Sequence, residues 1–541
     1  MVFYKICIDF IREHQPLLYG HLAVTVVFFG LAVGIVPWVM NTIKDIKSKT
    51  QFKAFFYKVL LFALCILPLF LIKMYTQNIL FPKWNKYVRS KLFELYLEKN
   101  TTNFKESDVS ADIVTLFEVA EQTSLIFNWF ATIFVPVVIS ILCINVYMYF
   151  VDPVIGFLCT CTTFLIAFQL ITNIAHVSNM YLEKHIHYKS MLSTLDNTYT
   201  NLFNVYLNNK ISDTVQNNQK IEENYETKIN TSAYSLLSFA LVLRMISYVF
   251  VLLILCYIYI QSKETLPDSF YTIMTLIFFY VSRVDELTES VPLYLSKIVG
   301  LSLHEHLFKP EQLTYEPFSD LKGDIRFDHI TFGYNTSATI QDFSLHVKPG
   351  QRIGIVGETG TGKTTLMKLL LKFYKPNQGT ILIDGKDLQT IDPVELRKQV
   401  YYINQRTMLF NDSLLNNLRY GTTCTEDDVR EFIHKYNLES VFNQRGDQWL
   451  HTKVETNGSN ISMGMQKVIF LVRGMLHRAP VYLIDEPFTS IDDASRAKVL
   501  RLIDEETKGK TVLVITHDKE GLDQMFDHMV RLTKTVTSID L

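Results

Sequence analysis

The amino-acid sequence predicts two domains of different character, an all-α membrane domain over residues 1–308 and a soluble α/β domain over residues 321–541. Two observations support this division. The first part contains several long stretches with almost no charged residues, as membrane helices require. After about residue 305 the pattern changes to short β-type runs, turns and amphipathic helices, none long enough to cross a membrane. Residues 309–320, which include Pro310 and Pro317, are predicted to be the linker.

Composition narrows the function classes. The chain has 541 residues, 48% of them hydrophobic, with 52 basic and 54 acidic residues and a net charge of −2. This balance provides no overall field that would attract nucleic acid, so no nucleic-acid partner is predicted. Five of the seven cysteines lie in apolar stretches, where cysteine behaves as a small hydrophobic residue, and no metal-binding set is indicated.

Six membrane helices are predicted in the first domain. About 20 apolar residues suffice to cross the hydrocarbon core as a helix. Four stretches meet this requirement clearly: residues 15–43, 124–151, 153–175 and 233–262. Two shorter stretches, residues 59–72 and 269–282, need long flanking side chains to extend them. A soluble helical core is the alternative for any one stretch, but four in series argue against it.

Charged residues near these stretches leave alternatives open. Residues 2–14 have apolar residues near helical spacing, which indicates either a short interfacial helix or a frayed terminus. Arg244 lies inside the fourth long stretch, where a charge needs a cavity or a partner. We interpret it as lining a substrate cavity or as forming an ion pair within the bundle. Arg283, Asp285 and Glu286 are expected where the sixth helix leaves the membrane.

A glycine-rich segment in the second domain has the sequence and context of a P-loop, because a β-type run precedes it and a helical run follows. It consists of Gly357, Glu358, Thr359, Gly360, Thr361, Gly362, Lys363, Thr364 and Thr365. The glycines let backbone N–H groups surround a phosphate chain, and the helix N-terminus favours negative charge. Lys363 would reach the β- and γ-phosphates, and the Thr364 hydroxyl would bind Mg²⁺. The segment therefore predicts ATP and Mg²⁺ as cofactors.

Two adjacent carboxylates, Asp485 and Glu486, end the buried β-type run that begins at Val481. Asp485 fits the acidic residue that holds Mg²⁺ in P-loop enzymes, and Glu486 is placed to orient or deprotonate a water molecule. Such a run alone is also common where a strand meets a solvated turn. Its position downstream of a P-loop, within one domain's length, favours the catalytic interpretation.

From Tyr334 to His517 the chain resembles the nucleotide-binding domain of an ATP-binding cassette (ABC) transporter. With the preceding apolar stretches, it is similar to a half-transporter of the exporter type, in which a six-helix membrane domain is fused to one cassette. The resemblance implies that Tyr334 stacks on adenine. It also implies that Gln405 senses Mg²⁺ and water and faces the membrane domain.

The resemblance assigns four further residues in the cassette. Asp485 corresponds to the Walker B aspartate and Glu486 to the catalytic glutamate. Asp492 corresponds to the D-loop aspartate, and His517 to the switch histidine at the γ-phosphate. Taken one at a time, these residues could have ordinary structural roles: Tyr334 in a strand, Gln405 in a loop and His517 as a capped histidine. Their order and spacing together favour the functional roles.

The signature segment departs from the family pattern. Where the family usually reads LSGGQ, this chain has ISMGM over residues 461–465. Ser462 and Gly464 remain, and the resemblance places them at the γ-phosphate held by the opposite subunit. Met463 replaces a glycine and Met465 a glutamine. If that glycine adopts positive φ or permits close approach, Met463 should hinder closure, so we expect slower hydrolysis with ATP binding retained. Drift in an inactive protein is the alternative.

The resemblance implies a multi-pass membrane protein that uses ATP binding and hydrolysis for alternating access. The alternative is an ATP-binding membrane protein that gates or regulates with weak or no turnover. A homodimer is expected, with a heterodimer as runner-up, because the family sandwiches nucleotide between two cassettes. Coupling helices are expected near residues 98–106 and 196–205. The cassette is placed in the cytoplasm, with membrane lipid around the spans, although Lys44, Lys47 and Lys49 fit that orientation poorly. The transported substrate is not predicted.

Overall fold

The computed structural model describes residues 2–44, 46, 48–101, 109–261, 269–309, 315–334, 338–358, 360–404, 408–442, 448–516, 525–533 and 537–540. The chain forms two compact units. The first contains residues 1–97 and 107–310, and the second contains residues 98–106 and 311–541.

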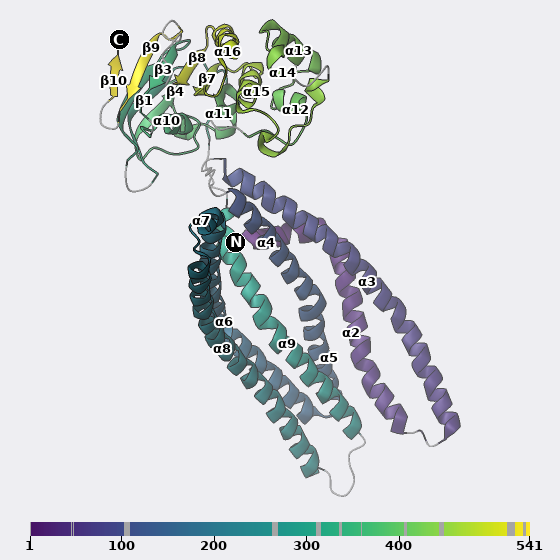
Figure 1. The fold of residues 1–541 in the computed structure, drawn as a ribbon. Helices are drawn as coiled ribbons and strands as arrows, with labels where there is room; N and C mark the ends of the chain where they lie inside the picture. Colours follow the sequence, from purple (N-terminus) through teal and green to yellow (C-terminus); the bar gives the residue numbers. More distant parts are fainter. Residues whose placement is uncertain are drawn as a thin grey trace. The chain divides into compact units, whose positions relative to one another are not determined.

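The first unit is entirely helical in its described part (Figure 1). Its helices are α1 (Val2–Glu13), α2 (Gln15–Lys44), α3 (Lys49–Lys99), α4 (Val109–Trp129), α5 (Val135–Val151), α6 (Pro153–Thr200), α7 (Leu202–Leu207), α8 (Ile211–Gln261) and α9 (Phe270–His304). A π-helical segment, Phe130–Phe134, joins α4 to α5 without a break. Helix α6 begins directly after α5, because the Asp152 carboxylate caps it by accepting from the amides of Val154 and Ile155.

Five helical stretches of the described residues are long and apolar enough to cross a membrane, and they lie in α2, α3, α4 with α5, α6 and α8. The weaker predicted stretch at residues 59–72 lies within α3, so it belongs to one of them. The other weak stretch, residues 269–282, lies in α9, which is not among the five. Arg283, Asp285 and Glu286 interrupt its apolar sequence without ending the helix, which continues to His304.

Arg244 on α8 forms ion pairs with α9. Its Nη2 lies 2.7 Å from Glu289 Oε1, and its Nε lies 3.4 Å from Asp285 Oδ1. Arg283 pairs with Glu286 one helical turn away, at 2.6 Å. These contacts favour the ion-pair interpretation of Arg244, since a charge in a membrane helix is much less costly when it is paired.

Helices α6 and α8 are 48 and 51 residues long. At 1.5 Å per residue each spans about 70 Å or more, over twice the roughly 30 Å of a hydrocarbon core. The short helix α7 joins them at one end, at the place predicted for the second coupling helix. The first predicted coupling segment, residues 98–106, groups with the second unit, although residues 102–106 lie outside the described part.

The second unit contains two sheets. Its strands are β1 (Ile325–Phe332), β2 (Ile340–Val347), β3 (Arg352–Val356), β4 (Gln378–Ile383), β5 (Lys386–Asp387), β6 (Val400–Ile403), β7 (Val481–Asp485), β8 (Thr511–Ile515), β9 (His528–Leu532) and β10 (Thr537–Asp540). One sheet has the order β10-β9-β3-β8-β7-β6 and is parallel except for β10. The other has the order β2-β1-β4-β5 and is antiparallel. In a parallel sheet the carboxyl ends of the strands share one edge, where ligands usually bind.

Helices complete the second unit. They are α10 (Lys363–Leu370), α11 (Pro393–Gln399), α12 (Leu414–Leu418), α13 (Glu426–Lys435), α14 (Glu439–Phe442), α15 (Met463–Leu476) and α16 (Asp493–Glu506). One hydrophobic core lies between the two sheets and includes α10, and a second packs α12 to α16 against the other face of the parallel sheet. The prediction of an α/β domain is therefore confirmed.

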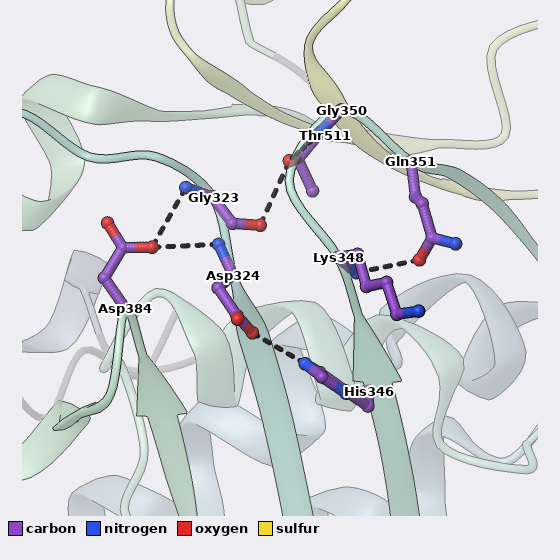
Figure 2. Close-up of polar contacts among 8 residues, drawn as sticks. All are labelled: Gly323, Asp324, His346, Lys348, Gly350, Gln351, Asp384 and Thr511. Atoms are coloured by element: carbon purple, nitrogen blue, oxygen red, sulfur yellow. Dashed lines mark hydrogen bonds and ion pairs between the residues drawn. The ribbon is translucent and has the colours of Figure 1, made fainter.

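Polar contacts at the start of β1 fasten the two sheets to each other (Figure 2). The Asp384 carboxylate accepts from the backbone amides of Gly323 and Asp324 at 3.1 and 2.9 Å. The Thr511 hydroxyl, at the start of β8, donates to the Gly323 carbonyl and accepts from the Gly350 amide. Gly323 has φ +91°, and a Cβ there would lie 2.4 Å from Thr511 Oγ1, so glycine is required.

Candidate functional site

The P-loop lies between β3 and α10, as the sequence predicts, and its shape depends on its glycines. Gly360 and Gly362 have φ values of +84° and +95°. A Cβ on Gly357 would lie 2.4 Å from the Leu532 carbonyl oxygen, so no larger residue fits there. Thr361 closes the loop by donating its hydroxyl to the Glu358 carbonyl at 2.9 Å. Thr359 lies outside the described residues.

Lys363 is the first residue of α10, and its side chain folds back over the loop. The Nζ atom donates to the carbonyls of Gly357 and Glu358 at 2.7 and 2.9 Å. Burial lowers the pKa of Lys363, while the nearby carboxylates of Glu486 and Asp485 oppose that shift. A positive charge thus lies within the loop, at the N-terminus of a helix, where phosphate is favoured.

Asp485 ends β7 and is almost completely buried, at 1% exposure. Its Oδ2 accepts from the Thr364 hydroxyl at 2.7 Å and from the Tyr402 hydroxyl at 3.2 Å. A hydroxyl and a carboxylate from segments 121 residues apart are therefore in direct contact. Such oxygen donors are the ligands that Mg²⁺ prefers, so the side chains fit the predicted metal.

Glu486 follows directly and has φ +51°, a left-handed conformation that few non-glycine residues adopt. Its amide donates to the Ile515 carbonyl of β8 at 2.9 Å, which fixes the turn. Its Oε2 accepts a long hydrogen bond from the Thr489 hydroxyl at 3.4 Å. Strained backbone of this kind is characteristic of functional sites.

These residues converge on a cavity of about 560 Å³. Its lining comprises Tyr334, Thr339, Gly360, Gly362, Lys363, Thr364, Thr365, Asp485, Glu486, Thr489 and Ile515. The Tyr334 hydroxyl contacts the Thr365 hydroxyl at 3.1 Å, and the half-exposed Tyr334 ring lies beside Tyr374, with ring centroids 5.2 Å apart. The cavity therefore offers an aromatic side chain, a cation and two carboxylates together.

The signature residues do not belong to the lining of this cavity in the described part of the chain. Ser462 caps α15, because its Oγ accepts from the Met465 amide at 3.3 Å. Gly464 faces the Ser490 carbonyl so closely that an added Cβ would lie 2.6 Å from that oxygen. Met463 begins α15 and is 71% exposed, whereas Met465 is buried in the helical core. The backbone at residue 463 is helical, so the expectation of strain from positive φ does not apply and only the projecting side chain remains.

Asp492 lies outside the described lining of the cavity. Asp492 caps α16 instead, accepting from the Ser495 amide at 2.9 Å, and this hydrogen bond lowers the pKa of Asp492. Gln405 and His517 lie outside the described residues, so their roles stay predictions.

Several residues of the site were not found from the sequence. Thr339 and Thr489 line the cavity, and Tyr402 donates to Asp485. Lys467 donates from α15 to the backbone at the end of β7. No sequence motif predicts these contacts, and only the pairing of β6 with β7 brings Tyr402 near Asp485.

A P-loop between β3 and α10, paired carboxylates at the end of β7 and an aromatic residue from the antiparallel sheet define the ATP-binding domain of an ABC protein. Comparison with known families agrees, because residues 340–489 match the model described as "ABC transporter". Residues 340–489 therefore carry an ABC transporter domain, which implies nucleotide binding.

Curated relatives carry related names. The ATP-dependent lipid A-core flippase of Ralstonia nicotianae is 30% identical over 280 residues, covering 49% of this chain and 46% of that protein. The flippase of Sodalis glossinidius is 36% identical over 213 residues, covering 39% and 37%. A probable ABC transporter ATP-binding/permease protein of Haemophilus influenzae is 34% identical over 212 residues, covering 39% and 38%. The chain spans less than half the length of these relatives.

A solved structure shows how far the likeness extends in space. The structure titled "Structure of a bacterial Atm1-family ABC exporter with ATP bound" superimposes with a TM-score of 0.83, covering 96% of this chain and 94% of that chain at 16% identity. At this identity the match establishes the fold. The chain has the ABC exporter fold, with an N-terminal helical region of several apolar helices and a C-terminal α/β nucleotide-binding domain.

Proposed function

We propose that this protein is an exporter-type ABC half-transporter that couples ATP binding and hydrolysis to movement of a substrate across a membrane. The observation that carries the proposal is the convergence of Lys363, Thr364, Asp485 and Glu486 on one cavity. The described part of the other unit has five apolar helical stretches long enough to cross a membrane. The flippase and permease names of the relatives support the same function.

The cavity suggests how hydrolysis proceeds. Lys363 and the loop amides hold the phosphates, and Tyr334 contacts the adenine. Thr364 and Asp485 would hold Mg²⁺, which would neutralise developing phosphate charge when bound. Glu486 orients and activates the attacking water, and general base catalysis of this kind contributes about 10²- to 10⁴-fold. Its fixed turn keeps the carboxylate on the cavity wall.

We propose that the active form is a dimer. Ser462 and Gly464 lie outside the lining of their own chain's cavity, which fits a site completed by the signature of a second copy. A closed two-fold dimer is the commonest arrangement for such an assembly. A heterodimer with a second half-transporter is the alternative. Light scattering of the Glu486→Gln variant with Mg-ATP distinguishes them, since a homodimer has twice the 62.8 kDa chain mass without another protein.

We place the cassette in the cytoplasm, where ATP is available, and assign the long helices the task of transmitting its closure. Helices α6 and α8 exceed the hydrocarbon thickness by enough to carry α7 well outside the membrane. Residues 98–106 would supply the other coupling contact. Within the second unit, the Arg397 guanidinium donates to the Thr101 carbonyl, which supports that assignment.

The substrate class we propose is a lipid-like amphiphile, on the strength of the flippase relatives. The test is reconstitution of the purified chain in liposomes, with ATPase activity and translocation of a fluorescent phospholipid measured together. We expect both activities to require ATP and to be absent in the Glu486→Gln variant. ATPase activity without lipid movement would reject the substrate class alone, whereas a wild-type rate equal to that of the variant would reject the transporter.

A further inference from the structure

A buried lysine outside the ATP cavity connects three parts of the cassette. Lys467 lies in α15, five residues after Ser462, and is only 5% exposed. Its Nζ donates to the Asp485 carbonyl at 2.9 Å and to the Asn404 carbonyl at 3.2 Å. Burying an ammonium group costs several kcal/mol unless it is paired and hydrogen-bonded, so these contacts are needed to hold it there.

The two carbonyl acceptors each lie one residue before a predicted site residue. Asp485 ends β7 and directly precedes Glu486, and Asn404 follows β6 and directly precedes Gln405. Strands β6 and β7 are parallel neighbours, with Ile403 opposite Ile484. One ammonium group therefore links the carboxyl ends of both strands to the helix that begins at the signature.

The charged groups around Lys467 are consistent with an ammonium group that binds backbone carbonyls. Burial lowers the pKa of Lys467 to about 8, while the carboxylates of Asp485 and Glu486 oppose the shift. The Asp485 side chain is already engaged by the hydroxyls of Thr364 and Tyr402. Lys467 is absent from the described lining of the candidate nucleotide cavity.

We propose that Lys467 is a positioning residue for ATP hydrolysis, which holds the carbonyl ends of β6 and β7 against α15 and so fixes Glu486 relative to the signature. The inference rests on the proposed ATPase function. Without this link, the turn that carries Glu486 is free to shift relative to α15. The nucleotide contacts of the P-loop, which lie on β3 and α10, remain intact.

The chain contains a closely matched control. Lys372 is 4% exposed, donates to two backbone carbonyls, those of Gln389 and Ile391, at 2.8 and 2.6 Å, and has its pKa lowered by burial to about 8. It lies outside the described cavity lining and outside the contacts of β6 and β7 with α15. Changing either lysine to methionine removes the same buried ammonium and leaves two carbonyls without their donor.

The experiment compares Lys467→Met, Lys372→Met and Lys467→Arg in the purified full chain, with kcat, KM for ATP and the melting temperature measured for each. We expect Lys467→Met to lower kcat at least tenfold with KM changed less than about threefold, and Lys467→Arg to recover part of kcat. Lys372→Met should keep kcat within about twofold at a similar melting temperature. Equal kcat losses in the two methionine variants would show a purely structural role and overturn the proposal.

Two further measurements keep failure of the proposal distinct from failure of folding or of the proposed function. Lys467→Gln retains an N–H donor at smaller size, and it replaces Lys467→Met in the same comparison if that variant does not fold. Wild type and Glu486→Gln are measured alongside. Equal ATPase rates for wild type and Glu486→Gln would reject the ATPase function, and the positioning role with it. If Glu486→Gln is slower than wild type but the Lys467 variants have normal kcat, only the positioning role is rejected.

Discussion

Gly464→Ala tests the contact between the signature helix and the D-loop. A Cβ at this position would lie 2.6 Å from the Ser490 carbonyl oxygen, well inside the 3.4 Å at which ordinary contact begins. The obstructing atom belongs to the backbone, and Ser490 already has φ +66°, so the segment has little freedom to move aside. Any movement displaces the chain between Glu486 and Asp492.

The expected size follows from two opposing terms. Overpacking of this kind costs about 1–3 kcal/mol. Replacing glycine by alanine within a helix returns up to about 1 kcal/mol. The net loss lies between about 0 and 3 kcal/mol and centres on about 1–2 kcal/mol, and a domain of this size shifts its melting temperature by roughly 2–4 °C per kcal/mol. We therefore expect the cassette transition to fall by about 2–8 °C and ATPase activity to fall further, because the displaced segment follows directly on Glu486, the proposed catalytic carboxylate.

Differential scanning calorimetry of the detergent-purified chain, with ATPase assays on the same samples, measures both effects. Met463→Ala is the matched control, since it lies in the same helical turn but changes a side chain that is 71% exposed. It should melt within about 2 °C of wild type. A Gly464→Ala variant that melts at or above the control, with normal ATPase activity, would refute the reasoning from the close contact.

Three further predictions concern other parts of the cassette. Met463→Gly should raise ATPase activity several-fold with little change in melting temperature, because it removes a projecting side chain; an unchanged rate would show that the methionine does not slow closure. Asp384→Ala should lower the melting temperature by several degrees, since it leaves three backbone amides without their carboxylate acceptor, and a melting temperature equal to that of wild type would contradict this. Glu506→Gln should be less stable than wild type at pH 7. Burial raises the pKa of Glu506, but hydrogen bonds from Lys435 and Tyr436 outweigh this and lower it below 4.5. The stabilisation by the Glu506 carboxylate is therefore present above pH 4.5 and is lost as the pH falls through the lowered pKa of the folded protein. Calorimetry should show the melting temperatures of wild type and Glu506→Gln converging in acid. A difference in melting temperature that stays constant with pH would contradict this prediction.

The sequence was sufficient to locate structural features that depend on consecutive residues. The P-loop and the Asp485–Glu486 pair were predicted, because a short motif and its flanking hydrophobic pattern determine their local structure. Long apolar runs likewise predicted the membrane helices. Residues whose role depends on pairing between distant segments were not found. Tyr402 reaches Asp485 only because β6 lies beside β7, and these strands are about 80 residues apart in the chain.

Two other differences have physical causes. Helix α9 continues past Arg283, Asp285 and Glu286, because ion pairs within α9 and with α8 satisfy these charges without ending the helix. Met463 causes no backbone strain, since Ser462 caps α15 and residue 463 adopts ordinary helical dihedrals. The sequence alone showed the substitution but not the conformation at that position.

The central claim is that Glu486 activates water for hydrolysis of a nucleotide held by the P-loop. The most direct measurement is ATP turnover by the purified full chain and its Glu486→Gln variant, together with Mg-ATP affinity for both. We expect the variant to bind Mg-ATP within a few-fold of wild type while turnover falls about 100-fold or more. Equal turnover by the two proteins would contradict it.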